Sequence, residues 1–369
     1  MESPTPAPQS DIPVRPASVD PAFWRDRRVL VTGHTGFKGA WLSLWLQSLG
    51  AQLAGVSLAA PPSTPSLYEL ARVAEGMAGS IACDIRDPLA LASAVTDARP
   101  EVVFHLAAQP FVRRSFLAPR ETYEVNAMGT LNLLEAIRAC PGVRACVVVT
   151  SDKCYENHES PQPYREQDPL GGHDPYSSSK AAAEIITSAY RRSFLSDPSG
   201  PRIASARAGN VIGGGDWGED RLVPDLLRAA VAHSDLRLRN PAAIRPWQHV
   251  LSPLSGYLLL AQSLFASEEP ARAWNFGPEL TDARTVEWVV RRVSDLWPGG
   301  VPWAVDDGPH PHEAHLLTLD SSRAREHLGW RPSPGLEDGL AATVAWYRAW
   351  QDGRDMREFT LAQVAAFGG

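Results

Sequence analysis

A glycine-rich turn directly after an apolar run is the feature that most constrains the fold of this chain. Gly33, Gly36 and Gly39 follow the run Val29–Thr32 and precede a helix candidate at Trp41–Leu49. Residues without side chains allow a tight turn, close packing of a helix on a strand, and close approach of the backbone to a bulky anion. Free N–H groups at the start of the helix would attract the same anion. The pattern predicts either an anion-binding strand–turn–helix unit or a tight turn alone.

Short apolar runs alternate with helical segments from about residue 27 onward. This alternation predicts βαβ units and therefore an α/β fold with a doubly wound parallel sheet that helices cover on both faces. After about residue 210, short strands mix with proline-rich connections, which indicates a smaller mixed α/β unit built onto the sheet. The strands predicted for the sheet are Val29–Thr32, Gln52–Ser57, Ser80–Cys83, Val102–Leu106, Ala145–Thr150 and Ile203–Ala206.

Composition and charge argue against several classes of partner. A net charge of -7 without basic runs gives no surface suited to nucleic acid or to an anionic membrane, and we expect no membrane-spanning segment. The cysteines Cys83, Cys140, Cys146 and Cys154 have no metal-binding or disulfide-framework spacing, so we expect no metal and a reducing, cytoplasmic environment. Residues 1–22 are rich in Pro and Ser and are predicted to form a disordered tail.

A tyrosine and a lysine stand four residues apart in the segment PYSSSK. If Pro175 precedes a helix, as the run Ser177–Tyr190 suggests, Tyr176 and Lys180 lie on one helical face, a single turn apart. A neighbouring ammonium would lower the pKa of the phenol toward working pH and make it a usable general base. The alternative is a simple surface pair.

A second polar cluster follows the predicted strand Ala145–Thr150. Ser151, Asp152 and Lys153 would stand at the carboxyl end of that strand, which is where open α/β sheets place their reactive groups. Their hydroxyl, carboxyl and ammonium groups suit hydrogen bonding and proton transfer. The alternative is a polar strand end that caps the next segment.

Taken together, these residues resemble the extended short-chain dehydrogenase/reductase superfamily. The resemblance rests on the glycine pattern, on Asp84 and Ile85 after a strand, on LAAQ at 106–109, and on the residues of the two polar clusters. Longer strings between about residues 23 and 350 are similar to the CDP-glucose 4,6-dehydratases: GHTGFKGAWL, PPSTPSLYE, SDKCYEN, GGHDPYSSSK, RAGNVIGGGDWGEDRLVPD and RPWQHVL.

This resemblance implies a redox-neutral elimination on a nucleotide sugar: oxidation at C4, loss of water across C5 and C6, and return of hydride to C6. It implies Tyr176 as the base at the 4-hydroxyl, Lys180 as the residue that tunes it and holds the nicotinamide ribose, and Ser151 as a hydrogen-bond partner of that hydroxyl. Asp152 would be the acid at C6 and Lys153 the base at C5, although related dehydratases carry Glu where this chain has Lys153.

The resemblance also implies a Rossmann-type NAD-binding domain. Residues 55–65 contain no arginine for the 2′-phosphate of NADP, which favours NAD, and no acidic residue for the ribose diol, which leaves a hydroxyl such as that of Ser57. The implied cofactor-binding residues are Gly33, Gly36, Phe37, Gly39, Asp84, Ile85, Ala107, Ala108, Gln109, Tyr176 and Lys180.

Fewer residues are candidates for binding the nucleotide part of the substrate. Asn210 begins a loop after the sixth strand, and Arg221 and Arg245 are candidates for the nucleotide diphosphate because a guanidinium binds phosphate in a bidentate manner. Considered separately, each arginine fits a solvated surface charge better, and its position in the sequence is what makes it a candidate. Ser252 stands where related members often carry an acidic residue, so the nucleotide-end contacts differ here.

The resemblance suggests an organisation and leaves alternatives open. Residues 23–210 would form the NAD-binding domain and 211–369 mainly a substrate domain, with stretches such as Asp338–Trp350 able to return to the first domain. The helix of Tyr176 and the helix Leu131–Ala139 would pair two or more copies. Other readings are a sugar-nucleotide epimerase, a dehydratase of another nucleotide sugar, and a non-enzymatic NAD-binding sensor, against which Ser151 beside the Tyr–Lys pair argues.

Overall fold

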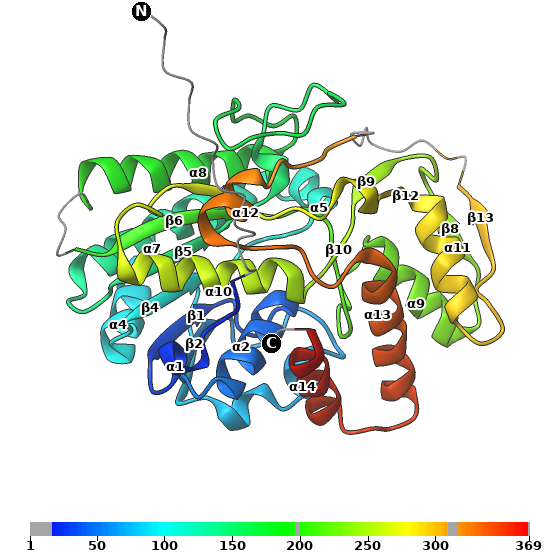
Figure 1. The fold of residues 1–369 in the computed structure, drawn as a ribbon, viewed down its shortest axis with the longest axis horizontal. Coiled ribbons are helices and arrows are strands. Elements are labelled where there is room, and N and C mark those ends of the chain that lie inside the picture. The colour runs from blue at the N-terminus through cyan, green and yellow to red at the C-terminus, as the bar shows by residue number, and fades with distance from the viewer. Residues whose placement is uncertain (1–16, 196–199, 307, 309–315, 368–369) are drawn as a thin grey trace, which may run out of the picture.

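The computed structural model describes residues 17–195, 200–306, 308 and 316–367. In this part of the chain a parallel sheet of seven strands runs in the order β11-β6-β5-β4-β1-β2-β3 (Figure 1). The strand order reverses between β1 and β4, which is the arrangement of a Rossmann-type doubly wound fold. Its strands are β1 (Arg28–Thr32), β2 (Gln52–Ser57), β3 (Gly79–Ala82), β4 (Val102–His105), β5 (Ala145–Val149), β6 (Arg202–Arg207) and β11 (Ala273–Asn275).

The predicted sheet is confirmed, with one strand added. Each of the six predicted strands is present, and its ends differ from the prediction by no more than one residue. The additional strand β11 pairs in parallel with β6, with Ala273 opposite Ser205. It escaped prediction because three residues are too short to show a periodicity, and because its partner lies some 70 residues earlier in the chain.

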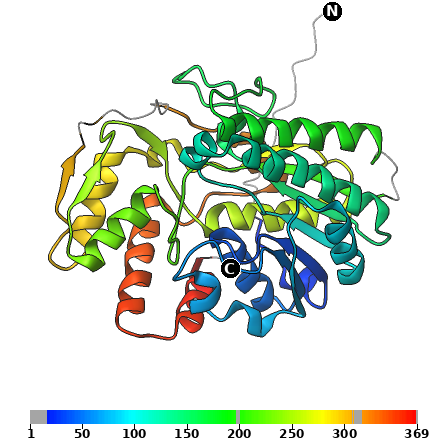
Figure 2. The same cartoon turned by 180° about the vertical axis from the view of Figure 1, so that it is seen from behind.

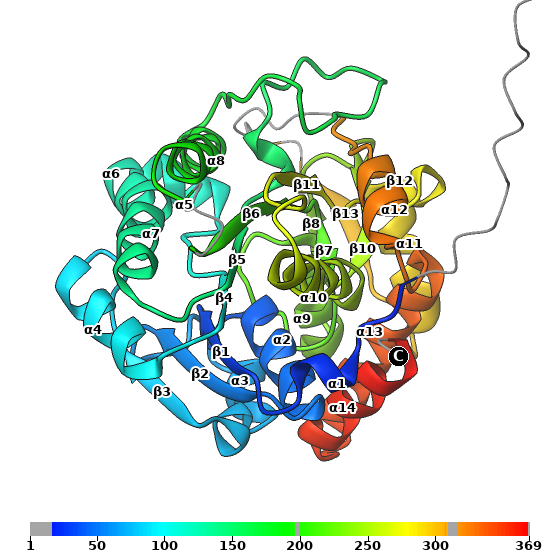
Figure 3. The same cartoon turned by 60° about the vertical axis from the view of Figure 1, so that its left-hand side comes forward.

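Helices cover both faces of the sheet (Figure 3). On one face lie α4 (Pro88–Ala98), α7 (Gly129–Ala139) and α8 (Pro175–Ser193), and on the other lie α2 (Phe37–Ser48) and α10 (Leu251–Ala266). Successive residues of a strand point to opposite faces. In β1, Val29 and Val31 therefore join the hydrophobic cluster of α2 and α10, while Leu30 joins that of α4 and α7.

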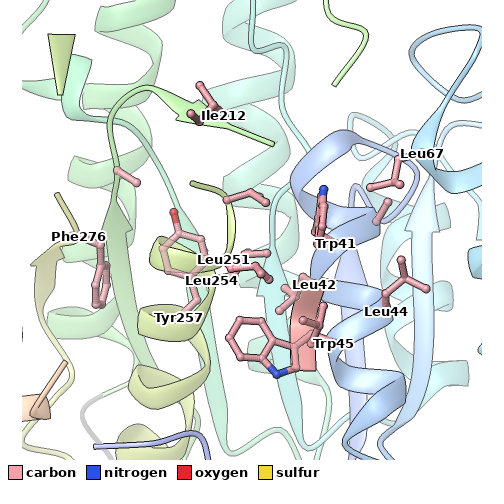
Figure 4. Close-up of a cluster of buried hydrophobic side chains, with 14 of the residues drawn as sticks. Trp41, Leu42, Leu44, Trp45, Leu67, Ile212, Leu251, Leu254, Tyr257 and Phe276 are labelled. Atoms are coloured by element: carbon pink, nitrogen blue, oxygen red, sulfur yellow. The ribbon is translucent and has the colours of Figure 1, made fainter. Parts of the chain in front are cut away.

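Large aromatic side chains fill the space between α2 and α10 (Figure 4). Trp41 and Trp45 of α2 face Leu251, Leu254 and Tyr257 of α10, and all five are buried. The indole Nε1 of Trp41 donates to the carbonyl of residue 214 at 2.9 Å, so burial leaves its polar atom paired. This packing fixes the first helix of the Rossmann unit against elements that come 200 residues later.

The C-terminal part builds a smaller layer beside the carboxyl ends of the sheet (Figures 1 and 2). Besides α10, the helices of the C-terminal part are α9 (Leu222–Ala232), α11 (Val286–Leu296), α12 (Ser322–Leu328), α13 (Leu336–Gln351) and α14 (Met356–Phe367), and of these α12 packs on α10 and β11. Its short strands are β7 (Val211–Ile212), β8 (Leu236–Leu238), β9 (Ile244–Pro246), β10 (Gln248–His249), β12 (Ala283–Thr285) and β13 (Trp303–Val305). They pair as β7 with β10, β9 with β12, and β8 with β13.

Several of these late segments lie against the sheet rather than apart from it. Strand β11 belongs to the sheet, α10 packs on β5 and β6, and α14 packs on α2. The predicted helix Asp338–Trp350 lies within α13, which contacts α11, α14 and β10. The remaining short elements are α1 (Pro21–Trp24), α3 (Leu67–Leu70), α5 (Val112–Leu117), α6 (Pro119–Tyr123), η1 (Val73–Gly76), η2 (Glu124–Met128), η3 (Asp152–Cys154) and η4 (Leu280–Asp282).

The predicted tail ends earlier than residue 22. Residues 1–16 lie outside the described residues, whereas the backbone N–H of Ala17 donates to the carbonyl of Gly329 and Val19 is buried. Asp20 then caps α1, its carboxylate accepting from the N–H of Ala22 at 2.9 Å. An apolar residue and a capping residue thus anchor this segment. Among the described residues, none of the helices has the length and apolarity needed to cross a membrane.

A buried ion pair ties α8 to the sheet. Glu184 of α8 and Arg207 of β6 approach to 2.8 Å, and each side chain is only 3% exposed. Thr150 and Ser205 donate to the same carboxylate at 2.5 and 2.6 Å. Burial alone would raise the pKa of Glu184, but the guanidinium and these hydrogen bonds outweigh it and lower the pKa.

We expect Glu184→Leu to destabilise the fold by about 3–5 kcal/mol, because it leaves the guanidinium of Arg207 buried and unpaired. The lowered pKa of Glu184 also means that its stabilisation is present above the unfolded-state pKa and is lost as pH falls through the folded-state value. Urea unfolding at neutral and acidic pH measures both effects. Glu135→Leu, which breaks an exposed pair with Arg138, is the control and should cost far less. Equal losses for the two variants would contradict the prediction.

Candidate active site

A cavity of about 570 Å³ opens at the carboxyl ends of the sheet strands, between them and the smaller layer. The sheet contributes the glycine turn after β1 and the residues that follow β2, β3, β4 and β5, and the smaller layer contributes the loops around α9 and β9. Almost every predicted site residue lines it: Gly33, Gly36, Phe37, Gly39, Asp84, Ile85, Ala107, Ala108, Ser151, Asp152, Lys153, Tyr176, Lys180, Asn210, Arg221 and Arg245.

Two glycines of the turn are required by close backbone contacts. Gly33 has a φ of +76°, and a Cβ there would lie 2.7 Å from the backbone nitrogen of Ala107. A Cβ on Gly39 would lie 2.0 Å from the carbonyl oxygen of Gly33. The turn therefore packs directly on the end of β4 and on its own helix, which keeps the start of α2 at the cavity wall.

Gln109 differs from its expected place, since it does not line the cavity. Its side-chain amide donates to Thr122 at 2.9 Å and accepts from the backbone N–H of Phe111 at 2.6 Å. Asn126, in η2, holds the backbone of Gln109 and also donates to Ser179 of α8 at 2.9 Å. Gln109 is thus buried in the support of the wall, because the loop after β4 turns its amide toward α6.

Helix α8 presents Tyr176 and Lys180 to the cavity on one face, as predicted. The helix begins at Pro175, and the carboxylate of Asp174 caps it by accepting from the N–H of Ser177 at 2.9 Å. Both side chains are buried, and Nζ of Lys180 lies 3.5 Å from the carbonyl oxygen of Val149 at the end of β5. One further turn along the same face lies Glu184, whose ion pair with the sheet holds this face in register.

The expectation of a lowered tyrosine pKa is wrong for this structure. Burial raises the pKa of Tyr176 to about 12, and the hydrogen bond with Ser151 and the charge of Arg221 offset only part of that rise. The same desolvation lowers the pKa of Lys180 to about 8. Burial disfavours both charged forms, so the nearby ammonium does not by itself produce a phenolate.

Ser151 and Asp152 lie next to this pair at the end of β5. The hydroxyl of Ser151 donates to the carboxylate of Asp152 at 3.0 Å and accepts from the backbone N–H of Lys153 at 3.2 Å. A Cβ on Gly209 would lie 2.8 Å from Oδ2 of Asp152, so the carboxyl packs against bare backbone. Burial raises the pKa of Asp152, although the charges of Lys153 and Lys38 oppose it. A carboxyl that keeps its proton is suited to act as an acid.

Lys38 is a site residue that the sequence reasoning missed. It lines the cavity from the first turn of α2, within the influence of the charges of Arg221, Lys180, Asp152 and Asp216. Burial and the two cations lower its pKa to about 8, against the effect of the carboxylates. A cation at the positive end of a helix is electrostatically unfavourable. A lysine at the start of a predicted helix, where its charge is unfavourable, was therefore the sequence signal that could have identified Lys38 as a site residue.

The substrate end holds both predicted arginines. Arg221 is paired with the buried carboxylate of Asp216 at 2.9 Å and lies over the ring of Phe111, while Arg245 of β9 lines the cavity beside Asn210. Asp216 was not predicted, because only the fold of the loop before α9 brings it to the guanidinium. Three more arginines line this end and were also missed: Arg113, Arg237 and Arg239.

The cavity fits a dinucleotide cofactor. The N-cap of α2, Gly36, makes no side-chain capping bond, so the first N–H groups of the helix are left for an anion. Strand β2 ends at Ser57, next to the glycine turn, and Asp84 and Ile85 follow β3 along the same wall. Within the described ranges there is no cluster of three or more His, Cys, Asp or Glu residues that could hold a metal.

Known proteins with a similar sequence or fold act on nucleotide sugars. The chain is 50% identical over 343 residues to a CDP-glucose 4,6-dehydratase of Salmonella typhimurium, covering 92% of this chain and 95% of that protein. A UDP-glucose 4-epimerase of Stenotrophomonas maltophila with bound NAD shares the fold, at a TM-score of 0.78 and 22% identity over 89% of this chain and 99% of that one. The UDP-glucose 4-epimerase of Thermus thermophilus, in complex with NAD, has a TM-score of 0.74 to this chain. The two are 29% identical, over 87% of this chain and 99% of that one.

The match to a family model extends from residue 30 to residue 343 and so spans the sheet, the cavity and most of the smaller layer. This chain therefore belongs to the GDP-mannose 4,6-dehydratase family.

Proposed function

We propose that this protein is an NAD-dependent CDP-glucose 4,6-dehydratase, a hydro-lyase that forms CDP-4-keto-6-deoxyglucose. The relative that is 50% identical over nearly the whole chain is a CDP-glucose 4,6-dehydratase, and structural neighbours contain NAD. The observation that carries the proposal is that the Tyr176–Lys180 pair and the Ser151–Asp152 pair line one cavity beside the glycine turn. Oxidation at C4 and elimination across C5 and C6 require two such sets of groups at one sugar.

NAD, held by the glycine turn and the first turn of α2, would supply the hydride acceptor at C4 and the hydride donor at C6. Tyr176 takes the proton of the 4-hydroxyl, and Ser151 orients that hydroxyl. The hydrogen bond with Ser151 and the charge of Arg221 offset part of the desolvation that raises the pKa of Tyr176. The 4-ketone acidifies the C5 proton, which Lys153 removes, and Asp152 protonates the departing C6 hydroxyl. Arg221 and Arg245 hold the diphosphate.

A sugar-nucleotide epimerase is the second candidate, since epimerases share the fold and the NAD requirement. An epimerase has no use for an acid at C6. The buried carboxyl of Asp152, whose pKa is raised, favours the dehydratase. Incubation with CDP-glucose and NAD tests the proposal directly, because the 4-keto-6-deoxy product absorbs strongly in alkali. Conversion of CDP-glucose to CDP-galactose would instead favour the epimerase, and bound NAD without turnover would favour a sensor.

Tyr176→Phe should lower kcat by about 10²–10⁴-fold, because the general base at the 4-hydroxyl is lost while the ring is kept. The alkaline absorbance of the product measures the rate. Tyr190→Phe removes a hydroxyl from the same helix outside the cavity and should leave the rate near that of the parent. A Tyr176→Phe variant as fast as the parent would rule out the assigned role.

Asp152→Asn should separate the two half-reactions. Oxidation at C4 should continue while water loss slows by about 10²-fold or more, since the amide cannot donate a carboxyl proton. Borodeuteride quenching followed by mass spectrometry would then find deuterium at C4 of a sugar that retains its C6 hydroxyl. Because burial raises the pKa of Asp152, its acid form persists to higher pH than that of an exposed carboxyl, and elimination should slow as pH rises through this raised pKa. Normal product formation by the variant would contradict the role.

The same proposal covers organisation and setting. A boundary near residue 210 would divide an NAD-binding domain from a substrate domain. Three later elements, α10, β11 and α14, would belong to the first domain, because they lie against the sheet or α2.

Four buried, free cysteines suit a reducing cytoplasm. Two copies would pair through α8 and the adjoining stretch from α6 to α7, in which Tyr123 of α6 and Met128 of η2 are exposed, as is Ile185 of α8. The hydroxyl of Tyr123 bonds Ser178, on the same face of α8 as Ile185.

Ile185→Glu should therefore convert the protein to a monomer, because it places a charge in an apolar contact. Size-exclusion chromatography with light scattering measures the mass. Leu89→Glu, at a highly exposed position of α4, is the matched control and should leave the assembly unchanged. A parent protein that is already monomeric would overturn the pairing.

A further inference from the structure

The loop between β7 and α9 carries a buried carboxylate at the substrate end of the cavity. The side chain of Asp216 is only 4% exposed, and both of its oxygens accept from Nη1 of Arg221, at 3.1 and 2.9 Å. Its Oδ1 also accepts from the backbone N–H of Gly218 at 3.0 Å. The carboxylate of Asp216 therefore binds its own loop and the guanidinium of Arg221 together.

Helix α13 holds this loop from behind. The hydroxyl of Tyr347 donates to the backbone carbonyl of Asp216, and the ring of Trp217 packs edge-on against that of Tyr347, with centroids 5.0 Å apart. A Cβ on Gly214 would lie 1.9 Å from Cγ of Trp346, so the loop backbone lies directly on the helix. Contacts with a much later part of the chain thus set the position of Asp216.

Arg221 is restrained on further sides and still lines the cavity. Its Cζ lies 5.2 Å from the centroid of the Phe111 ring, which belongs to the loop after β4. A Cβ on Gly218 would lie 3.1 Å from both Cδ and Nε of Arg221, so the bare backbone of Gly218 lies against this side chain. The side chain nevertheless keeps 33% of its surface exposed. The guanidinium is held in place and remains accessible.

The pairing with Asp216 leaves one edge of the guanidinium for a ligand. Among the described residues, Nε and Nη2 of Arg221 have no hydrogen-bond partner. These two groups lie on one edge of the planar guanidinium, and their spacing matches two oxygens of a phosphate. Arg228 on the same helix differs, because both of its Nη groups bond Asp225 or backbone carbonyls of the loop.

We propose that Asp216, fixed from behind by Tyr347, is a positioning residue for the substrate: it anchors Nη1 of Arg221 and so presents the edge of Nε and Nη2 to the diphosphate of the nucleotide sugar. The inference rests on the proposed function, which gives Arg221 the diphosphate. A carboxylate near a diphosphate repels it. If Asp216 only neutralised Arg221, its removal would therefore strengthen binding of the diphosphate, whereas loss of an anchor weakens it.

Asp216→Ala should raise the dissociation constant of CDP about tenfold, because the guanidinium loses its anchor and must be ordered when the ligand binds. Calorimetry with CDP is the measurement. Affinity for NAD should match that of the parent, which separates loss of the anchor from loss of the fold. Tighter or unchanged binding of CDP would overturn the inference.

Coupling to Arg221 tests whether Asp216 acts through it. The double variant Asp216→Ala, Arg221→Ala should bind CDP no worse than Arg221→Ala alone. Asp216→Asn loses the charge but keeps Oδ1, which accepts from both Arg221 and Gly218, so it should recover most of the affinity. In turnover of CDP-glucose, Asp216→Ala should raise KM and leave kcat near that of the parent. Additive losses, or no recovery by Asn, would overturn the positioning role.

Tyr347→Phe tests the support from α13 without changing Asp216. It keeps the ring against Trp217 and removes only the hydrogen bond to the carbonyl of Asp216. KM for CDP-glucose should rise about threefold, as for one lost neutral hydrogen bond, and kcat should stay near that of the parent. An unchanged KM would overturn the part assigned to Tyr347.

A control and the parent protein separate this inference from the proposed function. Glu101→Ala breaks a half-buried pair with Arg27 at the amino ends of the strands, away from the cavity, and should leave CDP affinity unchanged. If the parent binds UDP and not CDP, the proposed substrate fails, and the same variants measured with UDP decide the role of Asp216. If the parent binds CDP and the Asp216 variants bind it equally well, only the positioning role fails.

Discussion

The close approach of the turn after β1 to the end of β4 is the contact on which the rest of the site depends. With no Cβ on Gly33, its backbone lies against Ala107, and with none on Gly39, the first turn of α2 lies against Gly33. Strand order reverses at this point, so the sheet has a crevice there. Any larger residue at Gly33 or Gly39 would push α2 away, and the helix end, β2 and β5 would no longer share one cavity.

The chemistry of the cavity is a balance between burial and pairing. Desolvation raises the pKa of Tyr176 and of Asp152 and lowers that of Lys180, so each group tends toward its neutral form. Glu184 behaves differently because a guanidinium and two hydroxyls compensate its charge. The same helix thus carries a fully paired charge for stability and incompletely paired groups for reaction, which fits the general pattern of functional sites.

Much of the fold and of the candidate site could be predicted, because the relevant signals are local. The six strands are apolar runs, and Tyr176 and Lys180 share a helical face through their spacing alone. Strand β11 and Asp216 carry no such signal, since their partners lie far away in the chain or across a loop. Gln109 was misplaced because sequence spacing fixes a strand end but not the direction of the side chains that follow it.

The sequence by itself determined the glycine turn, the alternation of strands and helices, and the order of the reactive groups, because each depends on residues within a few positions of one another. Tertiary structure alone decided the protonation tendencies of the site, since desolvation depends on everything packed around a group. It also decided that the hydroxyl of Ser57 lies at the cavity wall within hydrogen-bond distance of His34. The pKa shifts and these side-chain contacts arise only when segments distant in the sequence pack together and exclude water from the cavity wall.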